Sequence, residues 1–146
     1  MNSREIKHLH PTLQPLCLQF LANCKAAGLN VFITQTYRSV EYQNSLYARG
    51  RTQSQLNAVG LSGIKAEPSK PRVTNAKGGT SEHDRTLAGV PASRAFDIAF
   101  MHDGKASWAD SMPWARAGSI GKALGLDWGG DWKSFVDRPH FQLRKS

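Results

Sequence analysis

Long apolar segments are the clearest absence from this sequence of 146 residues. No apolar run approaches the roughly 20 residues that a membrane-spanning helix needs, so we expect no stable insertion into a membrane. The first residues, MNSREIKHLHPT, are polar and lack the apolar core of a signal peptide. We therefore expect the chain to be made in the cytoplasm and not to be exported by a cleaved signal.

Cysteine is also scarce, with two residues in the chain. Cys17 and Cys24 are seven residues apart in a segment of helical periodicity, which separates them by roughly 10 Å along a helix axis. That separation is too large for a disulfide. Both cysteines fall on the apolar stripe of the segment, so we expect buried thiols that form neither a metal pair nor a nucleophile.

Acidic residues are few relative to basic ones, with 11 Asp and Glu against 19 Lys and Arg and a formal net charge of +8. This excess favours an anionic partner such as nucleic acid, a membrane surface or an acidic cell wall, although it can also serve solubility alone. The basic residues are scattered along the chain and match no nucleic-acid-binding motif. A nucleic-acid partner is therefore not expected.

Apolar periodicity and turn residues predict one α+β domain over residues 1–146, without repeats or an internal boundary. Gly and Pro are frequent in residues 51–80, which are expected to form a long irregular connection of the kind that is usually functional or mobile. Residues 127–132 are expected to form a turn. The predicted helices are 13–27, 40–49 and 114–124, and the predicted strands are 29–38, 94–101 and 140–143.

Two of the five histidines, His83 and His140, lie at the edges of predicted strands, near carboxylates and next to glycine or proline. Zinc hydrolases commonly hold the metal with two histidines and a carboxylate and leave one position for water. His83, Asp97 and His140 would supply that set. A structural hydrogen-bonded pair is the alternative interpretation, and spacing alone does not decide between the two.

Hydrolysis by a metal-activated water also needs a carboxylate that takes the proton of the water and passes it to the leaving amine. Asp137, three residues before His140, is the best placed candidate. On a regular strand this offset would put the two side chains on opposite faces. Pro139 indicates that the strand begins only at His140, so Asp137 can turn inward from the loop.

The combination of "SEH", "AFDIA" and "DRPHF" resembles the signature of the zinc D-alanyl-D-alanine peptidase superfamily. The segments "ITQTYRSVEYQNSLYARGRT" and "VTNAKGGTSEH" are similar to its phage endolysin branch, the L-alanyl-D-glutamate peptidases, which cut peptidoglycan stem peptides. The likeness extends from about Val31 to Leu143. It implies a small, mainly antiparallel sheet with flanking helices, zinc bound by His83, Asp97 and His140, and a general base at the position of Asp137.

The resemblance also implies roles for the residues around this set. Arg38 would stabilise the oxyanion or hold a substrate carboxylate, whereas without the resemblance it would be a surface arginine paired with Glu41. Ser81 would contact the substrate. Gln43 and Tyr47 are further candidates for the lining of the cleft, or else helix residues that pack under the loop.

The spacing between His83 and Asp97 departs from the family pattern. Thirteen residues separate them, instead of the six in His-x-x-Gly-x-Ala-x-Asp. The extra residues include Gly89 and Pro91 and are expected to form a surface loop, whose closure costs only about 0.6 kcal/mol per doubling of length. Asp84 is the alternative ligand, but Asp97 is favoured because a strand fixes its position.

The leading hypothesis is a zinc-dependent endolysin that hydrolyses an amide bond of stem peptides, in the first place L-Ala-D-Glu. A D-Ala-D-Ala carboxypeptidase or dipeptidase with the same site is one alternative, and a non-catalytic basic protein that binds wall or nucleic acid is another. The resemblance implies an antibacterial phage protein that acts as a monomer on peptidoglycan. It would be made in the host cytoplasm, reach the periplasm or wall after release by a holin, and carry no separate wall-binding module.

Overall fold

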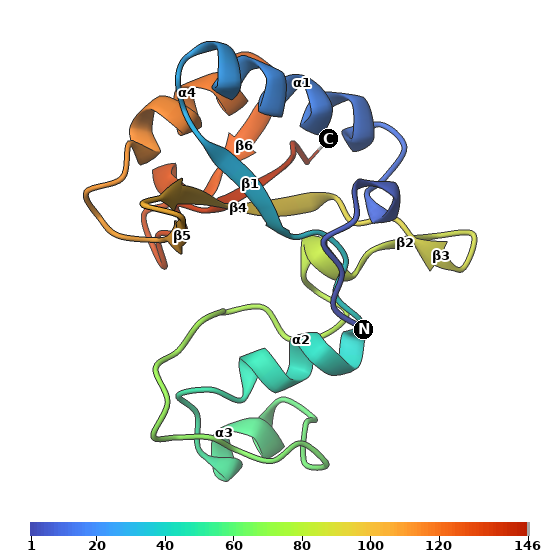
Figure 1. The fold of residues 1–146 in the computed structure, drawn as a ribbon. Coiled ribbons are helices and arrows are strands. Elements are labelled where there is room, and N and C mark those ends of the chain that lie inside the picture. The colour runs from blue at the N-terminus through green and yellow to red at the C-terminus, as the bar shows by residue number, and fades with distance from the viewer. Residues whose placement is uncertain (146) are drawn as a thin grey trace.

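A five-stranded antiparallel sheet lies at the centre of the computed structural model, which describes residues 1–145 (Figure 1). Its order is β1-β4-β7-β6, and β5 pairs with the far end of β4. A separate two-stranded hairpin, β2 and β3, lies between His83 and Asp97. The strands are β1 (Val31–Gln35), β2 (Thr86–Leu87), β3 (Val90–Pro91), β4 (Ala95–His102), β5 (Lys105–Ser107), β6 (Leu126–Trp128) and β7 (His140–Leu143).

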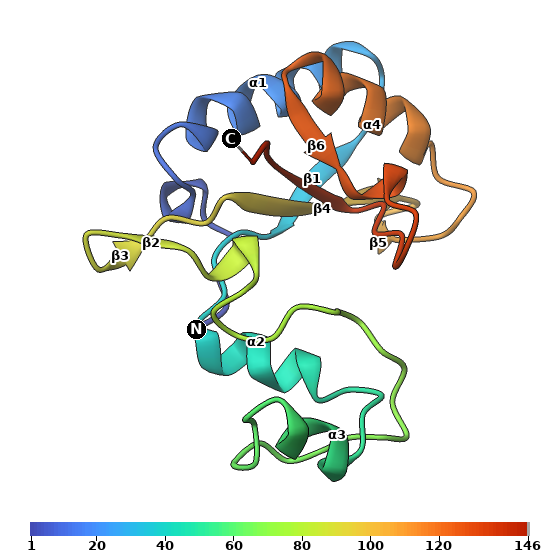
Figure 2. The same ribbon diagram turned by 180° about the vertical axis from the view of Figure 1, so that it is seen from behind.

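The helices lie on two sides of this sheet, as the opposite views in Figures 1 and 2 show. Two of them, α1 and α4, cover one face, and α2 and α3 lie on the other side of the molecule. Three short 3-10 turns complete the chain. The helical elements are α1 (Leu13–Ala26), α2 (Val40–Tyr47), α3 (Gln53–Ala58), α4 (Trp114–Ala123), and the turns Ile6–His8, Glu82–Asp84 and Gly129–Asp131.

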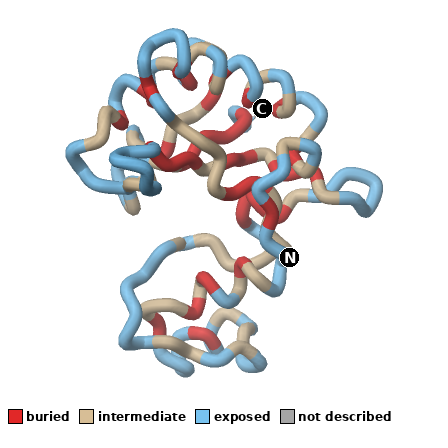
Figure 3. Tube along the Cα trace, viewed as in Figure 1, coloured by how far each residue is buried: buried red, intermediate tan, exposed pale blue. Residues whose placement is uncertain are grey.

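The hydrophobic core lies between the sheet and the helices α1 and α4, where buried residues are concentrated (Figure 3). Phe20 of α1 contacts Phe96 of β4 and Phe141 of β7, with ring centroids 5.4 and 4.7 Å away. Gly121 of α4 leaves room for the Phe141 ring, which a β-carbon at this position would strike. We call this part, the five-stranded sheet with α1 and α4, the sheet body.

Residues 40–80 form a second region, which we call the α2–α3 lobe. Its buried apolar side chains are few, namely Leu46, Ala48 and Leu56. Polar contacts hold the rest together: Gln43 Nε2 donates to the carbonyl of Ala76 at 2.7 Å, for example. The lobe is therefore fixed more by hydrogen bonds than by burial of apolar surface.

The predicted α+β class, the antiparallel sheet and the main helices and strands are confirmed. Cys17 and Cys24 are buried free thiols, and burial raises their pKa to about 12 and about 11. No helix within residues 1–145 is long and apolar enough to cross a membrane.

Two predictions about local structure were wrong. Residues 51–80 are not wholly irregular, because α3 begins in a capping box of Thr52 and Gln55, a sequence signal for a helix start. Residues 127–132 are not only a turn, because β6 extends to Trp128 and pairs with β7 before the chain turns.

Candidate metal centre

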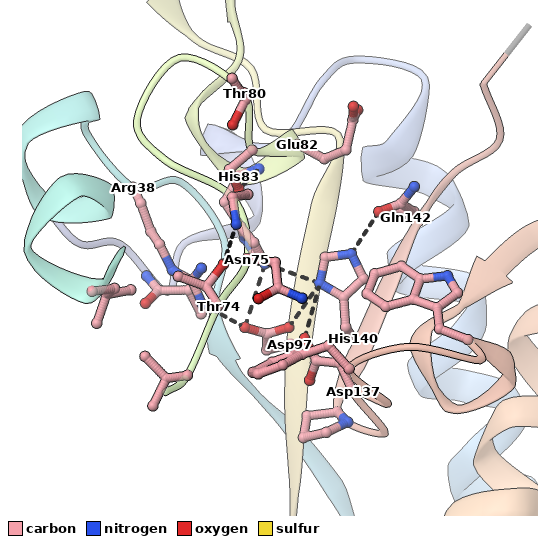
Figure 4. A pocket seen from close by; sticks show the side chains of 18 of the residues that line it. Arg38, Thr74, Asn75, Thr80, Glu82, His83, Asp97, Asp137, His140 and Gln142 are labelled. Atoms are coloured by element: carbon pink, nitrogen blue, oxygen red, sulfur yellow. Dashed lines mark hydrogen bonds and ion pairs between the residues drawn. The ribbon is translucent and has the colours of Figure 1, made fainter. Parts of the chain in front are cut away.

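Strand pairing sets the positions of Asp97 and His140. Asp97 lies near the start of β4, a strand that pairs with both β1 and β7, and its direct partner on β7 is His140. Directly paired residues of antiparallel strands project their side chains to the same face, so the carboxylate and the imidazole meet. His83 reaches them from the 3-10 turn Glu82–Asp84 (Figure 4). The hydrogen bond from Arg38 N to His83 O, 2.9 Å, ties this turn to the segment that follows β1.

The three predicted ligands converge. His83 Nε2 is 3.3 Å from His140 Nδ1 and 3.4 Å from Asp97 Oδ2, and His140 Nδ1 is 3.3 Å from Asp97 Oδ1. Ligand atoms bound to a tetrahedral zinc ion at about 2.0–2.1 Å are about 3.3–3.4 Å from one another. These three residues form a group that could hold a metal ion, and their spacing suits one face of a tetrahedral site.

Hydrogen bonds at the far side of each imidazole fix which nitrogen faces the group. His83 Nδ1 lies 2.7 Å from the carbonyl of Thr36, which can only accept. His140 Nε2 lies 2.7 Å from Oε1 of Gln142. Each of these nitrogens therefore donates, which leaves His83 Nε2 and His140 Nδ1 with lone pairs for a metal.

Burial and charge shift the pKa values in this group in different directions. Burial lowers the pKa of His83, and Asp97 offsets this only in part. Burial also acts on His140, but its hydrogen bond to Asp97 and the charge of Asp97 outweigh it, so this pKa is raised. Against the effect of burial, His83, His140 and Arg38 hold the pKa of Asp97 well below its ordinary value. The group thus combines a carboxylate and a neutral imidazole with a second imidazole whose proton a metal cation would displace.

Asp137 lies beside the group. Its Oδ2 is 3.9 Å from His140 Nδ1, and β7 begins at His140, as the presence of Pro139 predicted. Gly129 permits this loop geometry, because a β-carbon there would strike the backbone of Asp137. Burial, and then the charge of Asp97, raise the pKa of Asp137 to about 6, a value suited to a group that accepts a proton near neutral pH.

Arg38 also lies at the centre, where its contacts rule out the alternative of a surface arginine paired with Glu41. Its guanidinium donates to Asp97 Oδ2 at 2.9 Å and to Gln43 Oε1 at 3.1 Å, and its buried Nε has no hydrogen-bond partner. Glu41, its alternative partner, forms no ion pair with it among the described residues. Arg38 therefore supports a predicted ligand directly and keeps one unused donor.

A cleft of about 850 Å³ opens over this group, between the sheet body and the α2–α3 lobe (Figure 4). Ser81 lines it, and its hydroxyl also accepts from His83 N at 3.1 Å. Gln43 and Tyr47 do not line it. Gln43 is fully buried behind Arg38, and Tyr47 lies under the guanidinium of Arg51, so both correspond to the alternative of packing beneath the loop.

The long connection between His83 and Asp97 does not separate the ligands. It forms the β2–β3 hairpin, whose tip residues Leu87 and Val90 are exposed. Asp84 does not replace Asp97: its Oδ2 accepts from Gly79 N at 2.7 Å, and it is not part of the His83, Asp97 and His140 group.

Three neighbours of the centre were missed in the sequence. Gln142 lies two residues after His140 on one strand, so strand periodicity could have placed it on the same face. Trp132, whose ring centroid is 5.0 Å from that of His140, and the carbonyl of Thr36 carried no such signal.

Several known proteins resemble this chain in sequence. Two family profiles described as D-alanyl-D-alanine carboxypeptidase match the chain, one over residues 6–106 and the other over residues 74–143. The peptidoglycan L-alanyl-D-glutamate endopeptidase CwlK of Bacillus subtilis is 32% identical over 143 residues, covering 92% of this chain and 73% of the relative.

Solved structures share the fold at lower identity. The Serratia marcescens L-Ala D-Glu endopeptidase ChiX is 18% identical, with a TM-score of 0.55 over 95% of this chain and 83% of its own. A variant of the vancomycin-resistance D,D-pentapeptidase VanY, solved with Zn(II), is also 18% identical, with a TM-score of 0.58 over 92% and 72%. One of these family profiles covers most of this sequence, and CwlK is 32% identical to it over 92% of the length of this chain. The chain therefore belongs to the D-alanyl-D-alanine carboxypeptidase family.

Proposed function

We propose that this protein is a zinc-dependent peptidase that hydrolyses an amide bond in peptidoglycan stem peptides, and that this bond joins L-alanine to D-glutamate. The observation that carries the proposal is the set of two imidazole nitrogens and a carboxylate, 3.3–3.4 Å apart, in a group that could hold a metal ion. A metal cation held by this set would replace the proton that Asp97 stabilises on His140.

The ligand types favour zinc, which is commonly bound by two histidines and a carboxylate in hydrolases. His83, Asp97 and His140 would hold it. The related VanY structure contains Zn(II). The choice of bond follows two relatives, CwlK and ChiX, which are named as L-alanyl-D-glutamate endopeptidases.

A zinc ion held there would act as a Lewis acid and would lower the pKa of a water molecule toward about 7. Asp137 takes the proton of the attacking water and transfers it to the leaving amine. Arg38 donates to Asp97 and adds to the effect of His83 and His140 that keeps this carboxylate ionised, and its free Nε is available to negative charge that develops in the cleft. Ser81 contacts the substrate at the cleft wall.

The net charge of +8 favours binding to an anionic wall polymer. We propose that the protein acts as a monomer in the periplasm or cell wall. Its origin in a phage, and its release by a holin, stay predictions from the sequence resemblance.

Metal analysis and product analysis together test the proposal. We expect one zinc ion per chain in the purified protein, and digestion of isolated peptidoglycan should yield peptides with a new amino terminus at D-glutamate by mass spectrometry. Loss of a terminal D-alanine instead would select the carboxypeptidase activity for which the family is named. Absence of both products, with no bound metal, would contradict the proposal.

A further inference from the structure

Arg49 has hydrogen-bonding capacity that the protein itself does not use. It follows Ala48, the C-cap of α2, and lines the cleft. Its buried Nε has no hydrogen-bond partner, and it forms no ion pair with any residue of the range 1–145. The backbone of Glu67 forms an isolated β-bridge with that of Arg49, but the carboxylate of Glu67 forms its ion pair with Lys70. A buried N–H group without a partner is costly, so a bound anion here would recover free energy.

The neighbouring arginine shows the contrast. Arg51 is buried, and its guanidinium donates to the carbonyl of Tyr47 at 2.6 Å, to the carbonyl of Thr74 at 3.0 Å and to Oδ1 of Asn75 at 3.3 Å. Arg51 thus fixes the segment that forms part of the cleft wall. Because Oδ1 of Asn75 accepts from Arg51, its amide nitrogen is left as a donor in the same wall.

The acidic groups of the cleft already have partners elsewhere. Glu82 pairs with Arg85 and Arg94, and Asp127 pairs with Arg144. Asp97 and Asp137 lie at the metal centre. Within the part of the chain that the structure describes, no carboxylate of the cleft pairs with Arg49, so its free Nε is available to an anion from outside the chain.

We propose that Arg49, with the amide of Asn75, binds a free carboxylate of the substrate and so selects anionic stem peptides. This inference rests on the proposed function. A glutamate that continues a peptide through one carboxyl keeps the other free, and a guanidinium matches a carboxylate with two parallel hydrogen bonds. A stem peptide in which this carboxyl is converted to an amide would lose that pairing.

Binding of an uncleavable peptide pair tests this inference separately from catalysis. Both peptides carry a reduced CH2–NH link in place of the L-Ala-D-Glu amide, and they differ only in a free carboxylate or a carboxamide on the glutamate. We expect the wild-type protein with its metal to bind the carboxylate peptide about tenfold more tightly in calorimetry, the scale of a charge-assisted pair in a partly exposed site.

Substitutions test whether the preference for the carboxylate peptide depends on the side chain of Arg49. Arg49→Gln should bring the affinity ratio close to one without changing the affinity for the carboxamide peptide, and Arg49→Lys should keep part of the preference because it keeps the charge. Arg72→Gln is the matched control, since Arg72 lies against Gly50 but does not line the cleft, and it should keep the full ratio. Thermal melting of each variant checks its fold.

An equal ratio in the wild type and Arg49→Gln would overturn the inference, as would a wild type without preference or without binding to either peptide. The proposed function fails by a different result, when metal-loaded wild type leaves the ordinary amide versions of both peptides uncut. A preference that depends on Arg49 in binding but comes without cleavage would support the anion site and reject the peptidase activity.

Discussion

The sheet body and the α2–α3 lobe are stabilised in different ways, although both border the same cleft. In the body, aromatic and aliphatic side chains fill the space between sheet and helices, as the Phe20, Phe96 and Phe141 cluster shows. In the lobe, Arg51 and Gln43 are buried where a core would hold apolar residues, and each makes several hydrogen bonds.

This difference corresponds to a division of tasks. Metal ligands need positions fixed to a fraction of an ångström, and packed strands supply them at Asp97 and His140. The wall of a substrate cleft needs hydrogen-bond donors and acceptors instead. Regions with few apolar contacts also unfold locally at a small cost in free energy. We therefore expect substitutions in the body to affect chemistry and global stability, and substitutions in the lobe to affect substrate binding and local stability.

The largest effect is expected when a ligand of the body is changed. Asp97→Asn keeps the shape of the side chain but replaces a carboxylate with a neutral amide, so it should lose bound zinc and lower kcat/KM by about 1,000-fold or more. Metal content and peptide cleavage measure this. Asp84→Asn is the matched control, since Asp84 lies outside the ligand group and that variant should keep its metal. Metal retained in Asp97→Asn but lost in Asp84→Asn would reverse the ligand assignment.

A second change, in the loop just before β7 of the body, tests the proton transfer separately from metal binding. Asp137→Asn should lower kcat by about 100- to 10,000-fold and keep zinc. A general base works only when ionised, so wild-type kcat/KM should rise as the pH increases through about 6, the raised pKa of Asp137. The fall in kcat/KM below this pH should be absent from the residual activity of Asp137→Asn. A fall in kcat/KM below about pH 6 that persisted unchanged in Asp137→Asn would show that Asp137 is not the group that titrates.

A change in the lobe should have a smaller and more local effect. Arg51→Met removes three hydrogen bonds and should destabilise the lobe by about 2 kcal/mol. Hydrogen exchange should become faster in α2 and in residues 73–76 while β4 and β7 keep their protection, and KM should rise more than kcat falls. Arg72→Met is the control for loss of one positive charge. Equally faster exchange in the body would mean that the two regions unfold as one unit.

The same contrast explains how much of the fold could be predicted. Helix α1 and strands β4 and β7 have periodic apolar residues, because each buries one face in the core, and the sequence was sufficient to locate them. The lobe lacks such periodicity, and α3 was missed although its capping box was visible. Strand β6 is three residues long and rich in turn-forming neighbours, so its pairing with β7 depends on tertiary contacts that no local pattern contains.

At the centre, ligand types and strand edges nominated His83, Asp97 and His140, and the family resemblance favoured a metal site over a structural pair. The contacts of Arg38 could not be predicted in the same way. Its guanidinium could have pointed to Glu41, to solvent or to the centre, and only the arrangement of β1, β4 and α2 directs it to Asp97. The burial of Gln43 follows from the same arrangement.

The smallest effect is expected at the β2–β3 hairpin, which belongs to neither region. Its base is held by Glu82, which pairs with Arg85 and Arg94, whereas the side chains of Leu87 and Val90 at its tip are 49% and 59% exposed. The tip is absent from the lining of the cleft. The double substitution Leu87→Ser and Val90→Ser should therefore change the free energy of unfolding by less than about 0.5 kcal/mol.

Metal content and kcat/KM should also stay unchanged in this variant, because Glu82 and its two arginines keep the base of the hairpin in place. Glu82→Gln is the informative comparison: it weakens both ion pairs in the turn that carries His83, so it should lower zinc affinity more than the tip substitutions do. If the tip variant instead lost activity with its metal retained, the inserted hairpin would have to be part of the substrate-binding wall, and the cleft would have three borders instead of two.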